Sequence, residues 1–223
     1  MTPPLRIAGL HPILDADWLE NNASPAIRAA CQPEAVARHL ATLPIPLIQL
    51  RAKGDPARAL AFMTRWLEAL RRHAPGVRVI LNDRVEWVES LGADGVHVGQ
   101  GDTPIPECRK HLGRGRILGL STHTAEEIRQ AEAFGVDYVG FGPVFVTATK
   151  SDTHAVQGVA TLTAIAAQTR LPVVAIGGIT LERLSEVIPC GVASAAMISA
   201  LWQEDWAWRL SAACRLWSDS ARS

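Results

Sequence analysis

The stretch GADGVHVG, residues 92–99, decides the fold, because GVDYVGFG repeats its pattern at residues 135–142. In each copy a glycine would end a helix, a tight turn would follow, and a short apolar strand would begin. Gly191-Val192-Ala193 starts a third, weaker copy. Helices followed by buried strands, repeated along one chain, predict a parallel sheet covered by helices.

Eight short apolar runs alternate with helical patterns along the chain. Eight such units in 223 residues predict an α/β fold, a closed (β/α)8 TIM barrel that forms a single domain over residues 1–223. A doubly wound sheet is the alternative, and the lack of a GxGxxG after the first strand disfavours it. The predicted strands are LHPIL (10–14), LIQL (47–50), VIL (79–81), GVHV (95–98), ILGL (117–120), YVGF (138–141), VVAI (173–176) and AAMI (195–198).

Three helices carry clear signals. Asp55 followed by Pro56 is typical of a helix start, and the run from Thr124 to Glu127 is a capping box. A last helix is expected directly after Ser199. The apolar faces predicted from helical spacing are Leu60, Met63, Leu67 and Leu70; Ile128, Ala131 and Phe134; and Trp202, Trp206 and Leu210.

The composition excludes several classes of protein. Lys and Arg balance Asp and Glu to a net charge of zero, which predicts neither a nucleic-acid partner nor a membrane-surface partner. The four cysteines form no CxxC pair, so we expect reduced, structural thiols in the cytoplasm. The N-terminal residues lack the apolar run of a signal peptide, and no uncharged segment reaches the roughly 20 apolar residues of a membrane helix.

Function in such a barrel gathers at the carboxyl ends of the strands. Gln49, Arg51 and Lys53 alternate at the end of the second predicted strand, so they would share one face. Cations buried there need an anion, and arginine suits the oxygens of a phosphate. A solvated charge cluster is the competing interpretation; Lys150, which follows the sixth strand, favours the phosphate.

Two carboxylates end neighbouring predicted strands. Asp83 follows the third strand and Asp102 the fourth. Mg²⁺ is typically held by one or two carboxylates together with substrate phosphates and water, so we expect these residues to bind Mg²⁺. The competing interpretations are a helix cap for Asp83 and a turn residue for Asp102.

Small residues end the last two predicted strands. Gly177-Gly178 before Thr180 would open a helix whose N–H groups could hold a phosphate, although the pair could be only a turn. Ser199 would add a hydroxyl or cap the last helix. The tryptophans of that helix predict packing or a contact in a homo-oligomer.

Two histidines lie near these strand ends. His97 lies within the fourth predicted strand, and a structural role is favoured over a catalytic one. His123 follows the fifth strand and could act as an acid or base or serve a structural role. The remaining histidines show no metal-ligand spacing.

The polar segment FGPVFVTATKSDTHAVQG, residues 141–158, follows the sixth predicted strand. Thr147, Thr149 and Lys150 cluster at its start. We interpret the segment as a lid that closes over bound ligand.

These motifs form an ordered set: QLRAK, LNDR, GADGVHVGQGD, GLSTHT, GPVFVTATK and AIGGI. The set resembles the thiamine phosphate synthase family, whose close relative is the thiazole tautomerase. The resemblance covers Gln49 to Ser199. It implies a (β/α)8 transferase that joins 4-amino-5-hydroxymethyl-2-methylpyrimidine diphosphate to hydroxyethylthiazole phosphate. Pyrophosphate would leave first, and the thiazole nitrogen would attack the resulting pyrimidine carbocation.

The resemblance also implies roles for single residues. Asp83 and Asp102 would bind Mg²⁺, and Ser121 would face the departing diphosphate. The diphosphate would be held by Gln49, Arg51, Lys53, Asn82 and Lys150, and the thiazole phosphate by Thr147, Thr149, Gly178, Ile198 and Ser199.

Two alternatives stay open. The first is a thiazole tautomerase-like isomerase with His123 as the acid or base, and the second is a non-catalytic phosphate-binding barrel. The chain departs from the family in its first strand, where Gly9-Leu10-His11-Pro12 stands in place of the usual aromatic residue.

Overall fold

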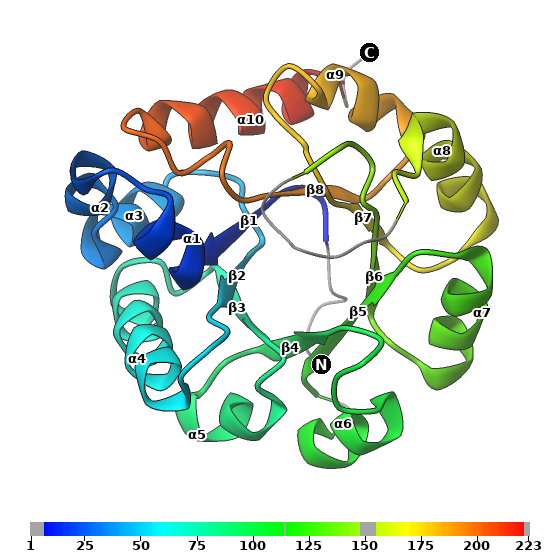
Figure 1. The fold of residues 1–223 in the computed structure, drawn as a ribbon, viewed down its shortest axis with the longest axis horizontal. Helices are drawn as coiled ribbons and strands as arrows, with labels where there is room; N and C mark the ends of the chain where they lie inside the picture. Colours follow the sequence, from blue (N-terminus) through cyan, green and yellow to red (C-terminus); the bar gives the residue numbers. More distant parts are fainter. Residues whose placement is uncertain (1–6, 114, 148–154, 221–223) are drawn as a thin grey trace.

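A computed structural model of the chain describes residues 7–113, 115–147 and 155–220. Eight parallel strands close into one barrel, and the helices lie outside it (Figure 1). The last strand pairs with the first, which closes the sheet through Leu10 and Ala195. The strands are β1 (Gly9–Asp15), β2 (Leu47–Arg51), β3 (Arg78–Asn82), β4 (Gly95–Val98), β5 (Ile117–Thr122), β6 (Tyr138–Phe141), β7 (Val173–Ala175) and β8 (Ser194–Met197).

The structure confirms all eight predicted strands and the (β/α)8 class. Several strands run farther than predicted, because the parallel ladder continues past the apolar run. Asp15 pairs with Arg51 in the register of β1 and β2, so two charged residues belong to the sheet.

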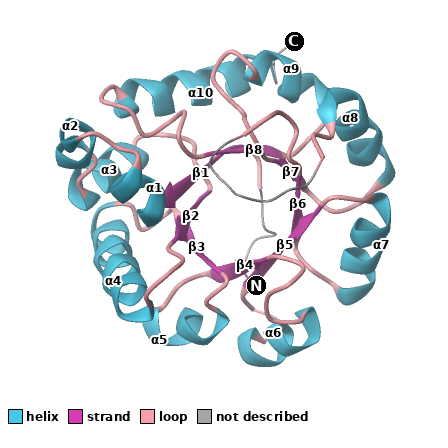
Figure 2. Ribbon diagram, in the orientation of Figure 1, coloured by secondary structure: helices cyan, strands magenta, loops and turns pink. Residues whose placement is uncertain are grey.

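The helices form a ring around the strands (Figure 2). Residues 16–40, between β1 and β2, form three short helices. The helices and 3-10 turns are α1 (Ala16–Asn21), α2 (Pro25–Ala30), α3 (Pro33–Leu40), α4 (Pro56–His73), η1 (Val85–Trp87), α5 (Val88–Leu91), α6 (Ile105–Leu112), α7 (Ala125–Phe134), α8 (Gly158–Gln168), α9 (Leu184–Val187), η2 (Ile188–Cys190) and α10 (Trp206–Ser220).

Both predicted helix starts are confirmed. The carboxylate of Asp55 accepts the N–H of Arg58, and Thr124 and Glu127 complete a reciprocal capping box. Two residues predicted on buried faces are exposed: Leu60 by 39% and Phe134 by 53%. The buried face of α4 is shifted toward Ala59 and Trp66, because it packs against α3 as well as the barrel.

The last helix begins later than predicted. Turns occupy the chain after Ser199, and α10 starts at Trp206. Trp202 lies in these turns and is fully buried, and its indole N–H is satisfied by donating to the carbonyl of Ile13 at 2.7 Å. A helix at Thr180 is likewise wrong, since α9 begins at Leu184.

The repeated motif has one structural role in both strong copies. Asp94 accepts the N–H of Val79 and a guanidinium N–H of Arg71, each at 2.7 Å. Asp137 does the same for Leu118 and Arg109, also at 2.7 Å. Each arginine also donates to the carbonyl of the glycine that ends the preceding helix. The motif therefore ties each helix end to the start of a neighbouring strand.

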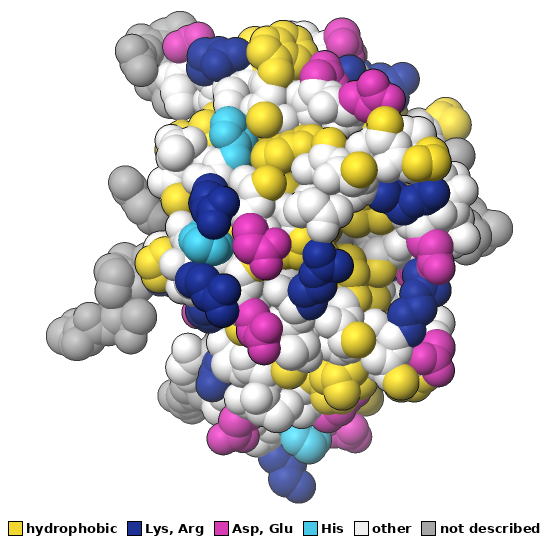
Figure 3. Space-filling model, turned by 90° about the vertical axis from the view of Figure 1, so that its left-hand side faces the viewer, with side chains coloured by type: hydrophobic (Ala, Val, Ile, Leu, Met, Phe, Trp, Pro, Cys, Tyr) yellow, Lys and Arg dark blue, Asp and Glu magenta, His cyan; other side chains and the backbone are white. Residues whose placement is uncertain are grey.

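The four cysteines are free and buried, as predicted for structural thiols. Over the described residues, no helix has the length and apolarity needed to cross a membrane. On the face shown in Figure 3, basic and acidic side chains are interspersed, in keeping with a net charge of zero.

Candidate active site

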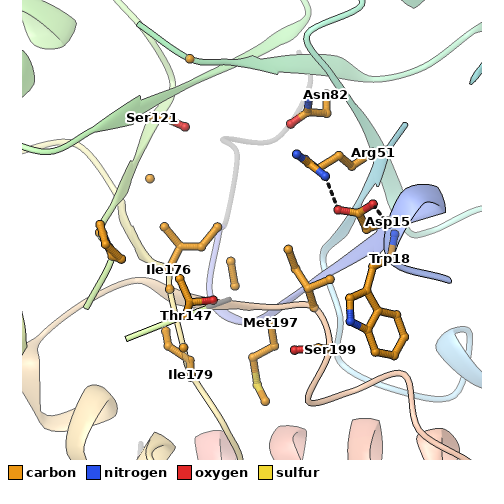
Figure 4. Close-up of a pocket in the computed structure, with 18 of the residues that line it drawn as sticks. Asp15, Trp18, Arg51, Asn82, Ser121, Thr147, Ile176, Ile179, Met197 and Ser199 are labelled. Atoms are coloured by element: carbon orange, nitrogen blue, oxygen red, sulfur yellow. Dashed lines mark hydrogen bonds and ion pairs between the residues drawn. The ribbon is translucent and has the colours of Figure 1, made fainter. Parts of the chain in front are cut away.

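A cavity of about 910 Å³ opens at the carboxyl ends of the strands, and residues on or directly after every strand line it. Side chains from β1, β2 and β3 face residues from β8 and the loops after β6 and β7 across the opening (Figure 4). The predicted site residues that line it are Arg51, Lys53, Asn82, Asp83, Asp102, Ser121, Thr147, Gly178, Ile198 and Ser199.

Three predicted residues do not join this set. Gln49 is buried and lines a second, much smaller cavity inside the barrel, next to His11. It lies one inward-facing position below Arg51, and for this reason it does not reach the mouth. Thr149 and Lys150 lie outside the described residues.

The first wall centres on Arg51, which forms an ion pair with Asp15. Asp15 is only 1% exposed, and its other oxygen caps α1 by accepting the N–H groups of Asp17 and Trp18 at 3.0 and 3.1 Å. The carboxylate is thus fixed by the fold, and it fixes the guanidinium in turn. Asp15 orients the cation but does not occupy all of its donors.

Two buried donors on this wall have no partner among the described residues. They are the Nε of Arg51 and the Nδ2 of Asn82. A buried donor without a partner costs about 1–3 kcal/mol, so two of them beside one cavity call for a ligand that accepts hydrogen bonds. A phosphate or diphosphate has only acceptors on its ionised oxygens and fits this wall.

Acidic residues adjoin the cations. Lys53 Nζ lies 3.4 Å from Asp83 Oδ2, and Asp83 shares a hydrogen bond with Asp102. Burial, together with the neighbouring Asp102, raises the pKa of Asp83 to about 6 despite Lys53. The backbone of Asp83 adopts a φ of 63°, a conformation uncommon outside glycine. Asp102 also accepts the N–H of Gly99 at 2.7 Å, which confirms the turn role considered for it.

This pair of carboxylates fits a hard divalent cation. Two oxygen-donor side chains lie together at the mouth, beside a wall suited to phosphate, and repel one another when ionised. Mg²⁺ commonly takes one or two carboxylates and completes its shell with phosphate and water. The described residues contain no cluster of three or more such ligands, so a substrate would have to supply the rest.

The opposite wall is built on Gly177 and Gly178, whose φ angles are 101° and 64°. A Cβ on Gly178 would lie 2.4 Å from the carbonyl oxygen of Val146, so only glycine fits. The loop from Val144 is bound to this turn: the N–H of Val144 donates to Ile176, and that of Phe145 to Gly177. The start of the predicted lid is therefore anchored, while residues 148–154 lie outside the described residues.

Arg183 adds a cation to this wall. Its guanidinium stacks 4.5 Å from the centroid of the Phe145 ring and donates to the carbonyl of Gly178 at 2.6 Å. Both contacts hold the planar group at the cavity, where it has donors to spare. Sequence reasoning missed Arg183, because it lies five residues beyond Gly178 on a turn that looked helical.

The two histidines near the strand ends both line the cavity. His123 Nδ1 bonds to the carbonyl of Gly142 at 2.6 Å, so Nδ1 carries a proton and the ring ties β5 to the end of β6. His97 bonds through both nitrogens to neighbouring side chains. His11 on β1 is buried and lines the smaller cavity in the barrel interior.

Asp15 was also missed, although the rule that found the other residues applies to it. It follows the apolar run of the first strand directly, as Arg51 follows that of the second. Its role as a helix cap is local, but its role as the partner of Arg51 depends on a contact 36 residues away, which sequence spacing does not show.

A sequence model described as thiamine monophosphate synthase matches residues 23–201, which is most of the chain. The chain belongs to the thiamine monophosphate synthase family. It is 44% identical over 154 residues to the thiamine-phosphate synthase of Moorella thermoacetica, covering 69% of this chain and 73% of that protein. It is 43% identical over 175 residues to that of Bacillus mycoides, covering 76% and 78%.

Solved structures agree with this assignment. The thiamine phosphate pyrophosphorylase from Pyrococcus furiosus matches with a TM-score of 0.78 and 28% identity, over 96% of this chain and 97% of that one. A structure titled native KDPGal matches with a TM-score of 0.67 and 17% identity, and shows a shared fold alone. The chain is a transferase of the thiamine-phosphate synthase class.

Proposed function

We propose that the cavity binds 4-amino-5-hydroxymethyl-2-methylpyrimidine diphosphate and hydroxyethylthiazole phosphate together and joins them to thiamine phosphate. The observation that carries the proposal is a pair of buried donors, on Arg51 and Asn82, that have no hydrogen-bond partner among the residues that the structure describes. They lie beside Lys53 and the carboxylates of Asp83 and Asp102. A diphosphate satisfies these donors and shares its charge with the nearby cations.

The reaction needs charge stabilisation rather than a strong base. The bond between the pyrimidine methylene and the diphosphate oxygen breaks, and its electron pair leaves with pyrophosphate. The thiazole nitrogen then donates its lone pair to the methylene, forming the new carbon–nitrogen bond. Arg51, Asn82 and Lys53 favour the first step because they are in place for the negative charge that grows on the leaving oxygen.

Asp83 and Asp102 would hold Mg²⁺ at this end of the cavity. When bound, the ion supplies positive charge to the diphosphate and needs no proton transfer. This pair favours the transferase over the isomerase alternative, because tautomerisation releases no diphosphate.

The thiazole phosphate would lie at the other wall. Gly178, Ile198 and Ser199 are in reach of the cavity there, and Thr147 lies at its rim. Arg183 supplies a cation for the second anion, so each wall would carry one phosphate-bearing substrate. This arrangement keeps two like-charged groups apart and leaves the reacting atoms between them.

The test is an assay of thiamine phosphate and pyrophosphate formed from the two substrates, with Mg²⁺ and with a chelator. We expect equal amounts of both products and a rate that depends on Mg²⁺. Failure to form thiamine phosphate under either condition would refute the proposed function. Activity that is unchanged by the chelator would refute the Mg²⁺ site alone.

A further inference from the structure

A line of hydrogen bonds runs from the barrel interior to the cavity. The hydroxyl of Tyr138 on β6 lies 3.0 Å from His97 Nδ1 on β4. His97 Nε2 lies 2.9 Å from the hydroxyl of Ser121 on β5. Tyr138 is fully buried, whereas Ser121 points into the cavity (Figure 4). Three neighbouring strands thus connect a buried phenol to a residue of the proposed site.

The barrel interior is shaped around these rings. A Cβ on Gly119 would lie 2.2 Å from Tyr138 Cζ and 2.5 Å from His97 Nδ1. A Cβ on Gly140 would lie 3.2 Å from His97 Cε1. Glycine at these two strand positions makes room for the rings, and the hydrogen bonds between them set their order. The three groups therefore keep a fixed order.

The protonation of the Tyr138 phenol determines which group donates and which accepts in each hydrogen bond of this line. Burial raises the pKa of Tyr138, so its hydroxyl keeps its proton and needs an acceptor. His11 also packs on the Tyr138 ring, with centroids 5.9 Å apart, but neither of its nitrogens has a hydrogen-bond partner within the described chain. His97 Nδ1 is the acceptor that the described contacts offer.

If His97 Nδ1 accepts this hydrogen bond, the positions of the other protons along the line follow. A neutral imidazole has one N–H, so the proton lies on Nε2 and is donated to the oxygen of Ser121. The reverse order, or a charged imidazole, would leave the buried phenol proton without an acceptor, at a cost of about 1–3 kcal/mol. Ser121 accepts from His97, and its own proton is free to point into the cavity.

We propose that Tyr138, acting through His97, positions the hydroxyl of Ser121 as a hydrogen-bond donor to ligand oxygens in the cavity. The inference rests on the proposed function, in which that oxygen belongs to the departing diphosphate. Tyr138 is a positioning residue, since it does not line the main cavity. The order of protons gives Ser121 a defined role, whereas a serine that donated to His97 would present only lone pairs and repel the anion.

The proton order can be measured without any assay of activity. Nitrogen-15 NMR of histidine-labelled protein distinguishes the two neutral tautomers, and the His97 signals are those that vanish in His97→Asn. We expect His97 protonated at Nε2 in the wild type and a loss of this preference in Tyr138→Phe. Protonation at Nδ1 in the wild type would overturn the inference, whatever the enzyme's activity.

A double-mutant cycle tests the effect on catalysis. We expect Tyr138→Phe to lower kcat on the order of tenfold, as for one lost hydrogen bond, with a smaller change in KM. In a Ser121→Ala background the same change should have no further effect, because Tyr138 acts through Ser121.

Ser194→Ala is the matched control, since Ser194 is buried on β8, donates to the Gly9 carbonyl and does not line the main cavity. In that background Tyr138→Phe should keep its full effect. An equal effect of Tyr138→Phe in the Ser121→Ala background would show a merely structural role and overturn the inference. A wild type that makes no thiamine phosphate would instead refute the proposed function, and the NMR result would still decide the proton order.

Discussion

The carboxylate of Asp15 holds the guanidinium of Arg51 at the mouth of the barrel, and the same two residues are register partners in β1 and β2. The Arg51 side chain is 11% exposed, so the pair is largely removed from water. Removing one partner of a buried ion pair lowers the free energy of unfolding by much more than the intact pair adds to it, because the other charge remains buried.

Asp15→Asn should therefore lower the free energy of unfolding by about 3 kcal/mol, even though asparagine can still cap α1. An anion bound beside Arg51 would replace the lost carboxylate. We expect pyrophosphate to raise the melting temperature of Asp15→Asn more than that of the wild type, as measured by calorimetry.

The matched control is Asp137→Asn, which breaks an Arg–Asp pair outside the cavity. It should lose stability but show the wild-type response to pyrophosphate. An equal pyrophosphate response in all three proteins would contradict the expectation that an anion bound beside Arg51 replaces the Asp15 carboxylate.

Asp83→Asn should stabilise the metal-free protein. The pKa of Asp83 is raised to about 6 in the fold from an ordinary value of 3.8, so the fold favours the protonated acid. The stability of the wild type should fall as the pH rises from about 4 to about 6, and the folded state then carries the cost of the ionised group. Asparagine removes this cost and tolerates the positive φ, so we expect a gain of about 1–3 kcal/mol at pH 7.5 and little at pH 4.

Chemical denaturation at the two pH values in the presence of a chelator measures this difference. The same carboxyl should link Mg²⁺ binding to pH, because the ion must displace a proton from Asp83 below pH 6. Calorimetric titration should show proton release at pH 5.5, little release at pH 7.5, and greatly weakened binding to Asp83→Asn. Binding of Mg²⁺ to the variant with wild-type affinity would place the ion elsewhere.

The strands could be predicted from sequence because a buried parallel strand needs little more than a short apolar run. Most of the cavity residues could then be predicted from the strand ends, because these ends converge in a barrel whatever the side chains are. The misses share one cause. Asp15, Arg183 and Trp202 act through partners far away in the sequence or through tertiary packing, and neither periodicity nor local capping signals encode such contacts.

The placement of Gln49 shows a second limit. Strand alternation correctly predicted that the side chains of Gln49 and Arg51 face the barrel interior. It does not predict how far along the barrel axis each side chain lies. Side chains one inward-facing step apart can therefore line different cavities.

Arg183→Gln should weaken binding at the second wall. The variant loses the cation while the glycine turn, which depends on backbone contacts, stays in place. We expect the KM for hydroxyethylthiazole phosphate to rise on the order of tenfold, as for one lost charge-assisted hydrogen bond, with little change in the KM for the pyrimidine diphosphate.

Steady-state kinetics with each substrate varied in turn will measure this effect. Arg170→Gln is the control, because Arg170 is exposed and does not line the cavity. A rise in the other KM instead would mean that the walls are assigned to the wrong substrates.

Asp94→Asn and Asp137→Asn should each destabilise the barrel without altering the chemistry. Each carboxylate accepts a strand N–H and a guanidinium N–H, so its neutralisation weakens two charge-assisted hydrogen bonds. We expect losses of about 1–3 kcal/mol in the free energy of unfolding, measured by urea denaturation. Glu89→Gln, an exposed change on the helix just before the first copy of the repeat, should stay within about 0.5 kcal/mol of the wild type. Wild-type stability in both variants would show that the contacts of the repeated motif do not contribute to the stability of the barrel.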